Sequence, residues 1–105
     1  MQKMELAGQM YEVDAKGYLQ ETDKWTEDIA RAYAQQEGVV ELTIDHWKIL
    51  YYLRKYYFAN GICPMIRRSL QENGFTLKQL YDLFPDGPAN SACKWAGMPS
   101  ATGCV

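Results

Sequence analysis

The segment 44–60 constrains the fold most, because it has the pattern of a long helix that is apolar on most of its sides. Thr43 can cap its beginning, and Gly61 can end it. A surface helix has one apolar stripe, whereas a helix that is apolar on most sides has to be surrounded by other elements. The large side chains that define the pattern are Trp47, Ile49, Leu50, Leu53, Tyr56, Tyr57 and Phe58. We therefore predict a helical bundle with this helix at its centre.

Proline, glycine and capping residues divide the rest of the chain into shorter helices. Thr76 and Gln79 form a capping-box pattern, and Pro64 suits the first turn of a helix. Gly38 and Gly74 follow apolar periodic segments and are typical helix ends. The four further helices are predicted over residues 23–36, 64–73 and 76–84, and from Pro88 to near Gly97.

A β-hairpin is predicted near the N-terminus, over residues 9–20. Tyr11 and Val13 alternate with polar neighbours, residues 14–17 (Asp-Ala-Lys-Gly) have turn chemistry, and an apolar pair follows. The predicted fold class is therefore mainly α. It is a small orthogonal helical bundle with an N-terminal β-hairpin, resembling a winged helix, and a flexible C-terminal arm.

The last residues of the chain have the composition of a mobile arm. Residues 97–105 contain Pro99, Gly103 and small polar side chains, and they show no apolar periodicity. Terminal segments of this kind are usually poorly ordered. At 105 residues the chain is expected to be a single domain, 1–105, with 97–105 as the arm.

Composition excludes several classes of function. The net charge is -2, which gives no field that would attract nucleic acid. The N-terminus lacks the apolar core of a signal peptide, and no segment is apolar enough to span a membrane, so a cytoplasmic protein without a membrane partner is expected. With one histidine and no Cys-x-x-Cys motif, neither a metal site nor a cofactor is predicted.

The chemically informative residues are two of the three cysteines. Cys104 is the second-to-last residue, where burial is difficult, so an exposed thiol on an arm is predicted; the alternative is a passive terminal thiol. Cys93 lies eleven positions earlier on a predicted helix, where it could also be a small core residue. Closing a loop of this size costs little entropy, and a flexible arm can bring the two Cα atoms within the ~4.4–6.8 Å of a disulfide.

Several segments resemble the DsrC/TusE family of sulfur carriers. They are residues 80–99, the ending Gly103-Cys104-Val105, residues 42–47 (Leu-Thr-Ile-Asp-His-Trp) and residues 64–67 (Pro-Met-Ile-Arg). The likeness extends over nearly the whole chain from about Tyr11. In this family the penultimate cysteine carries persulfide sulfur. TusE-type members, which serve tRNA thiolation, have only that cysteine, whereas DsrC-type members have a second one at the position of Cys93.

The resemblance therefore implies a DsrC-type carrier whose Cys93 and Cys104 bracket a sulfur atom, as a trisulfide in one form. It also implies a sulfite reductase as partner. The family arm usually reads Pro-Lys-Pro-Thr-Gly-Cys, whereas here Ser100 and Ala101 replace the lysine and the second proline. This removes a charge and makes the arm less stiff. The departure leaves three partners open: a variant reductase, a complex resembling heterodisulfide reductase, or another sulfurtransferase.

The other notable residues are predicted to have structural roles. Cys63 is expected to be structural. His46, in the first turn of the predicted helix 44–60, is expected to be a packing or capping residue. The tyrosines at 51, 52, 56 and 57 are expected to pack in and near the core. Arg67 and Arg68 form a basic pair that either lies on a solvated face or docks an acidic partner.

Two other classes of function compete with the carrier. Helices 64–73 and 76–84 with a hairpin could form a winged helix-turn-helix that binds DNA. Residues 77–84 would then read the bases, but they offer one lysine and one aspartate and are mostly apolar. A stand-alone thiol enzyme would need a base, and the fold would have to bring His46 near a cysteine.

Overall fold

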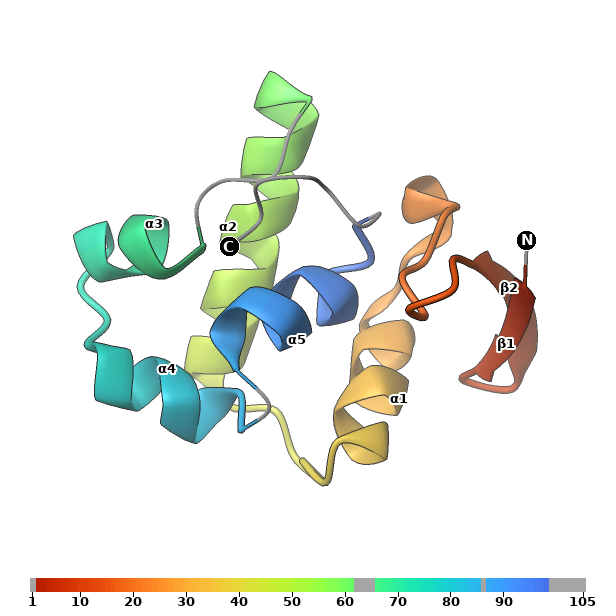
Figure 1. The fold of residues 1–105 in the computed structure, drawn as a ribbon, viewed down its shortest axis with the longest axis horizontal. Helices are drawn as coiled ribbons and strands as arrows, with labels where there is room; N and C mark the ends of the chain where they lie inside the picture. Colours follow the sequence, from red (N-terminus) through yellow and green to blue (C-terminus); the bar gives the residue numbers. More distant parts are fainter. Residues whose placement is uncertain (1, 62–65, 86, 99–105) are drawn as a thin grey trace.

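The computed structural model describes residues 2–61, 66–85 and 87–98, and within them the chain is mainly helical with a two-stranded antiparallel hairpin at its N-terminus (Figure 1). This is the predicted fold class. The elements in chain order are β1 (Gln2–Leu6), β2 (Gln9–Val13), the 3-10 helix η1 (Thr22–Lys24), α1 (Glu27–Gln36), α2 (Ile44–Asn60), α3 (Ile66–Glu72), α4 (Leu77–Leu83) and α5 (Pro88–Trp95).

The hairpin lies closer to the N-terminus than predicted. Its strands pair from Gln2 with Val13 to Leu6 with Gln9, and the turn between them is Ala7-Gly8, both with positive φ. Two positive φ angles are typical of the tight turns that suit hairpin twist. The predicted turn at 14–17 exists, because the Asp14 carboxylate accepts from the backbone N–H groups of Lys16 and Tyr18. Beyond that turn only a single bridge forms, between Val13 and Leu19.

The first helix ends where the sequence predicted but begins later. The Thr26 side chain accepts a hydrogen bond from the Ile29 N–H at 3.3 Å and caps α1. Residues 22–24 form the separate helix η1, and Trp25 is extended between the two. The predicted start at residue 23 was therefore wrong, because the extended backbone at Trp25 separates η1 from α1, and the Thr26 side chain caps α1.

The helix α2 has the predicted bounds, but it is not at the centre of the bundle. Its buried side chains are His46, Ile49, Leu50 and Leu53. Phe58 is 60% exposed and Tyr51 is 46% exposed, so a full side of the helix lies at the surface. The tyrosine hydroxyls explain much of the difference, since aromatic residues with a polar tip are stable in half-buried positions.

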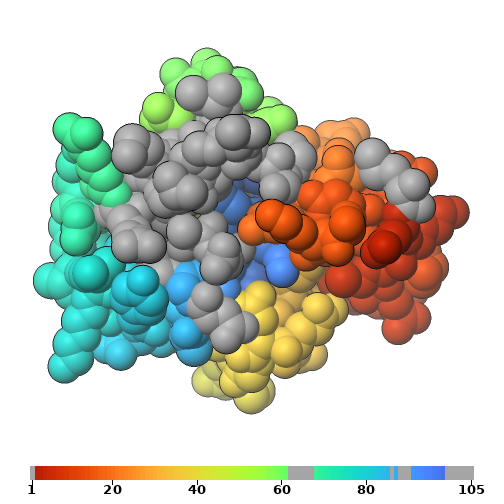
Figure 2. Space-filling model, viewed as in Figure 1, coloured from red at the N-terminus to blue at the C-terminus, as the bar shows by residue number. Residues whose placement is uncertain are grey.

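The central helix is α5. It packs against α1, α2, α3 and α4, and Figure 1 shows it between α1 on one side and the other three helices. Residues 91–93 and 95–98 are all buried, and most of them are small. Small residues let neighbouring helices approach closely, since the distance between helix axes depends on the side chains at the contact. The hairpin forms one end of the molecule and α3 with α4 the opposite end (Figure 2).

The core packs aliphatic and aromatic side chains and also buries the polar side chains of His46 and Ser91. Tyr33 is fully buried, and its hydroxyl donates to the Gly17 carbonyl at 2.6 Å. That bond satisfies a polar group that would be costly to bury alone. The largest fully buried side chains are Trp95, Tyr33, Phe84, Leu6, Leu19, Ile29, Ile49, Leu50, Leu53, Leu70 and Leu80. None of the helices in the described ranges has the length and apolarity needed to cross a membrane.

The end of α5 reverses the chain in a Schellman motif. Gly97 has φ +71°, its N–H donates to the Lys94 carbonyl, and the Met98 N–H donates to the Cys93 carbonyl at 3.2 Å. The Trp25 side chain covers Gly97 so closely that a Cβ there would lie 2.2 Å from the Trp25 Cδ1 atom. Two requirements therefore meet at Gly97, a left-handed backbone and the absence of a side chain.

We predict that Gly97→Ala destabilises the protein far more than Gly74→Ala. Gly74 ends α3 in the same motif with φ +96°, but a Cβ there would meet nothing within 4 Å. The control should lose about 1–2 kcal/mol of unfolding free energy, the cost of a left-handed alanine. Gly97→Ala should lose a further ~1–3 kcal/mol from overpacking against Trp25. Urea denaturation followed by circular dichroism measures both, and equal losses would contradict the packing argument.

Candidate functional site

One of the two predicted reactive cysteines lies within the described residues. Cys93 is on α5, in the middle of the core, and its side chain is 1% exposed. Cys104 and Cys63 both lie outside the described residues, as does the predicted arm from Pro99 onward. Gly97 and Met98, the first two residues of that predicted arm, are described, and both are buried.

The chain leaves α5 next to Cys93. The hydrogen bond from the Met98 N–H to the Cys93 carbonyl holds these two residues together after the reversal at Gly97. Position 104 lies six positions after position 98, with five residues between them. A segment of that length spans at most about 20 Å when extended. The covalent chain therefore keeps Cys104 within a short radius of the helix that carries Cys93.

Two side chains from distant parts of the sequence bind the last carbonyls of α5. The Trp25 indole N–H donates to the Trp95 carbonyl at 2.7 Å. The Arg54 guanidinium donates from Nη1 to the Ala96 carbonyl at 2.8 Å, and burial lowers the pKa of this group. These contacts join α5 to the start of α1 and to α2.

A carboxylate holds the other side of α5. Glu37, at the end of α1, accepts a hydrogen bond from the Trp95 indole N–H at 2.9 Å and another from the Ser91 hydroxyl. Ser91 and Trp95 are four residues apart and so lie on the same side of the helix. The α5 residues on both sides of Cys93 are thus fixed to α1 by one side chain.

His46 is a structural residue, as predicted. Its Nδ1 atom accepts from the Thr43 N–H at 3.0 Å, so Nε2 carries the proton and donates to the Leu83 carbonyl at 2.7 Å. The ring stacks on Trp95 and meets the edge of Phe84. Burial lowers the pKa of His46, against the smaller opposing effects of the Leu83 carbonyl and Asp45. With both nitrogens engaged, His46 is not placed to act as a base.

The predicted docking pair lies on α3. Arg68 is exposed and makes an ion pair with Glu72, one helical turn away, at 3.4 Å. The Arg67 side chain is outside the described part of the structure. An exposed pair of this kind contributes little to stability and leaves the guanidinium able to exchange partners.

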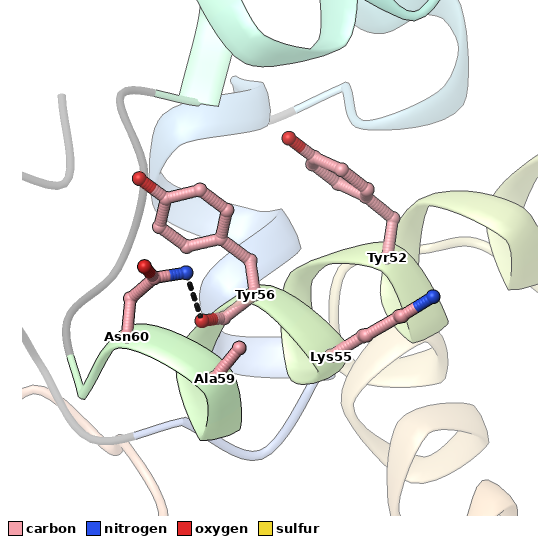
Figure 3. A pocket seen from close by; sticks show the side chains of 5 residues that line it. All are labelled: Tyr52, Lys55, Tyr56, Ala59 and Asn60. Atoms are coloured by element: carbon pink, nitrogen blue, oxygen red, sulfur yellow. Dashed lines mark hydrogen bonds between the residues drawn. The ribbon is translucent and has the colours of Figure 1, made fainter.

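A pocket of about 270 Å³ lies on the surface of α2 (Figure 3). It is lined by Tyr52, Lys55, Tyr56, Ala59 and Asn60, and the two tyrosine rings project from the same face of the helix. Cys93 is not among the described residues that line it. The two tyrosines are half-buried, in agreement with the predicted packing role. Among the described residues, no three His, Cys, Asp or Glu side chains gather as metal ligands would.

The helix-turn-helix alternative has the right elements but an unsuitable surface. The helices α3 and α4 pack against each other, and the hairpin lies at the other end of the molecule. The exposed side of α4 presents Leu77 and Tyr81, each about two-fifths exposed, next to Lys78 and Asp82. A helix that reads bases needs several donors and a basic surround, which this face lacks.

Fold and site together define a class: a small helical protein whose C-terminal segment begins beside a buried, disulfide-bonded cysteine. Comparison with known proteins gives the family. The family model described as "DsrC like protein" matches residues 5–105. The chain belongs to the DsrC-like family, as its sequence motifs indicated.

The relatives of this chain include two kinds of sulfur protein. It is 42% identical over its full length to the dissimilatory-type sulfite reductase subunit gamma of Nitratidesulfovibrio vulgaris, with all of both chains covered. It is 36% identical to the sulfurtransferase TusE of Salmonella paratyphi A, over 93% of this chain and 95% of that one. A chain in the crystal structure of dissimilatory sulfite reductase I matches with a TM-score of 0.86 and 44% identity, over 99% of this chain and 100% of that one.

Sequence reasoning missed Trp25, Arg54 and Glu37, the residues that hold α5 in place. Their contacts join positions 70, 42 and 58 residues apart in the chain, and no local pattern reports such pairs. The available signals were an arginine among the large apolar and aromatic side chains of segment 44–60 and a glutamate directly before a helix-ending glycine.

We predict that His46 makes stability depend on pH. Because the pKa of His46 is lower in the folded state, the unfolded state binds more protons, and stability falls as the pH drops below about 6.5. His46 is the only histidine, so His46→Gln should lose less unfolding free energy than wild type between pH 7.5 and pH 5.5. Urea denaturation at both values measures this, and parallel pH profiles would contradict it.

Proposed function

We propose that the protein carries sulfur, accepting it on Cys104 as a persulfide and resolving it with Cys93. The observation that carries the proposal is the full-length similarity to a sulfite reductase gamma subunit, together with that to a sulfurtransferase. The two cysteines lie eleven positions apart, and the segment between them begins beside Cys93. The protein is proposed to be a co-substrate of its partner, with no stand-alone catalysis required.

The proposed chemistry divides the two thiols by role. A donor transfers one sulfur to the Cys104 thiolate, which becomes a persulfide. The Cys93 thiolate then attacks the inner sulfur of that persulfide, forming a Cys93–Cys104 disulfide and releasing the outer sulfur as hydrosulfide. Two electrons from a thiol reductant restore both thiols. A sulfur delivered two electrons more oxidised would instead bridge the two cysteines as a trisulfide.

The burial of Cys93 supports this division. Cys93 is 1% exposed in its disulfide-bonded state, so we assign the first contact with a donor to Cys104 and the resolving step to Cys93.

The proposed partner is a sulfite reductase or another sulfurtransferase or heterodisulfide-reductase-like complex. Arg67 and Arg68 on α3 are proposed docking residues for an acidic surface of that partner. A second candidate function is a TusE-like relay in tRNA thiolation, which the 36% identity to TusE favours. The presence of Cys93 favours the DsrC-type proposal, since the TusE relay works with the penultimate cysteine alone.

We predict that Cys104 is required to accept sulfur, whereas Cys93 is required to release it. Incubation with a persulfide donor followed by intact-mass measurement should show one added sulfur on wild type and on Cys93→Ser, and none above background on Cys104→Ser. The Cys93→Ser variant should keep its persulfide for longer than wild type. Cys63→Ser is the matched control and should behave as wild type. Full loading of Cys104→Ser would refute the assignment.

We also predict that mild oxidation joins Cys93 to Cys104 within one chain. Closing this short loop should stabilise the folded state by only about 2–3 kcal/mol, so thiol reductants should reopen it. Digestion without reduction, followed by mass spectrometry of the linked peptides, identifies the product. A crosslink through Cys63, or a dimer through Cys104, as the main product would contradict the predicted disulfide between Cys93 and Cys104.

A further inference from the structure

All four carbonyls at the end of α5 have donors. A helix normally leaves its last four carbonyls without partners inside the helix. Here the Cys93 and Lys94 carbonyls accept from the backbone N–H groups of Met98 and Gly97. The Trp95 and Ala96 carbonyls accept from Trp25 and Arg54 as described above. The path of the chain after α5 is therefore fixed by its own turn and by two outside side chains.

Trp25 and Arg54 act as one unit. The Arg54 guanidinium lies over the Trp25 ring, 4.4 Å from its centroid, and its Nη2 atom donates to the Thr22 carbonyl at 3.1 Å. In the part of the chain that the structure describes, no ion pair uses Arg54. Its charge therefore faces the carbonyl end of α5, where the helix dipole favours a cation.

The unit also encloses the residue at which the chain turns. The Trp25 ring occupies the space that a side chain at position 97 would need, which leaves the Gly97 backbone little room to move. Met98, the next residue, is 1% exposed and is hydrogen bonded to the Cys93 carbonyl. Arg54, Trp25 and the Gly97 turn thus set the direction in which the chain continues.

We infer that Arg54 and Trp25 are positioning residues that hold the start of the C-terminal segment toward Cys93 and so favour exchange between Cys93 and Cys104. The inference rests on the proposed function. A segment that leaves α5 in one fixed direction samples less space than a free one, so the two thiols meet at a higher effective concentration. Neither side chain touches the reacting sulfur; both act through the backbone at residues 95–98.

The first test is the equilibrium of the Cys93–Cys104 disulfide with glutathione, measured by acid quench, alkylation and mass spectrometry. Arg54→Met should lower the effective concentration of the two thiols by about three- to tenfold, the effect of one lost hydrogen bond. Arg54→Lys should recover part of the loss, because it keeps the charge. Trp25→Phe should also lower the effective concentration, because it keeps an aromatic ring but loses the indole N–H that donates to the Trp95 carbonyl.

The matched control is Arg31→Met. Arg31 is also an arginine stacked on a tryptophan, 5.1 Å from the Trp47 ring, but within the described residues its ion pairs are with Glu27 and Asp28 of its own helix. It loses the same charge and the same kind of ring contact, and it should leave the disulfide equilibrium unchanged. A role of Arg54 in stability alone would lower the unfolding temperature without changing this equilibrium in the folded protein.

The second test needs no sulfur chemistry. In a Cys104→Ser background, amide hydrogen exchange by NMR should become faster at Gly97 and Met98 in Arg54→Met than in Arg31→Met. Two results would overturn the positioning role and leave the proposed function standing. One is unchanged amide exchange at Gly97 and Met98 in Arg54→Met. The other is an unchanged disulfide equilibrium in Arg54→Met when wild type forms the Cys93–Cys104 disulfide normally. A wild-type protein that never forms the Cys93–Cys104 link would refute the proposed function, and with it the role of Arg54 in the exchange.

Discussion

The structure depends on how the end of α5 is hydrogen bonded. The end of α5 is buried among four other helices, so each of its terminal carbonyls needs a hydrogen-bond donor. Trp25 and Arg54 supply two of those donors, and this requirement fixes where η1, α1 and α2 lie around α5. The turn at Gly97 supplies the other two and returns the chain to the helix that it has just left.

Trp95 connects these constraints across the core. Its indole N–H binds Glu37 of α1, its carbonyl binds Trp25, and its ring packs on His46 of α2 and Phe84 at the end of α4. Neutral His46 completes the arrangement, since one ring nitrogen caps α2 and the other holds the last turn of α4. The residues around Cys93 are therefore held by hydrogen bonds and ring contacts. In the proposed reaction, the sulfur on Cys104 has to come to Cys93.

Local signals in the sequence predicted those parts of the fold that local interactions determine. Thr43 and Gly61 gave the bounds of α2, and the Thr76–Gln79 capping box gave the start of α4 to within one residue. The hairpin was misplaced because the Ala7-Gly8 turn has weaker sequence signals than residues 14–17. The centrality of α5 was missed because small residues have no strong periodic pattern, and their value appears only when other helices pack on them. The reactive pair was predicted from the position of Cys104 and from the family resemblance; the burial of Cys93 agrees with a core position, and Cys104 lies outside the described residues.

The turn at Gly97 also marks the point after which sequence changes do not affect the hydrogen bonds at the end of α5. The hydrogen bonds that end α5 are complete at Met98, so none of them depends on the residues that follow. Changes beyond that point, such as Ser100 and Ala101 in place of the usual lysine and proline, leave the terminal carbonyls of α5 satisfied. The four hydrogen bonds that end α5 can therefore stay the same while the sequence of the tail varies.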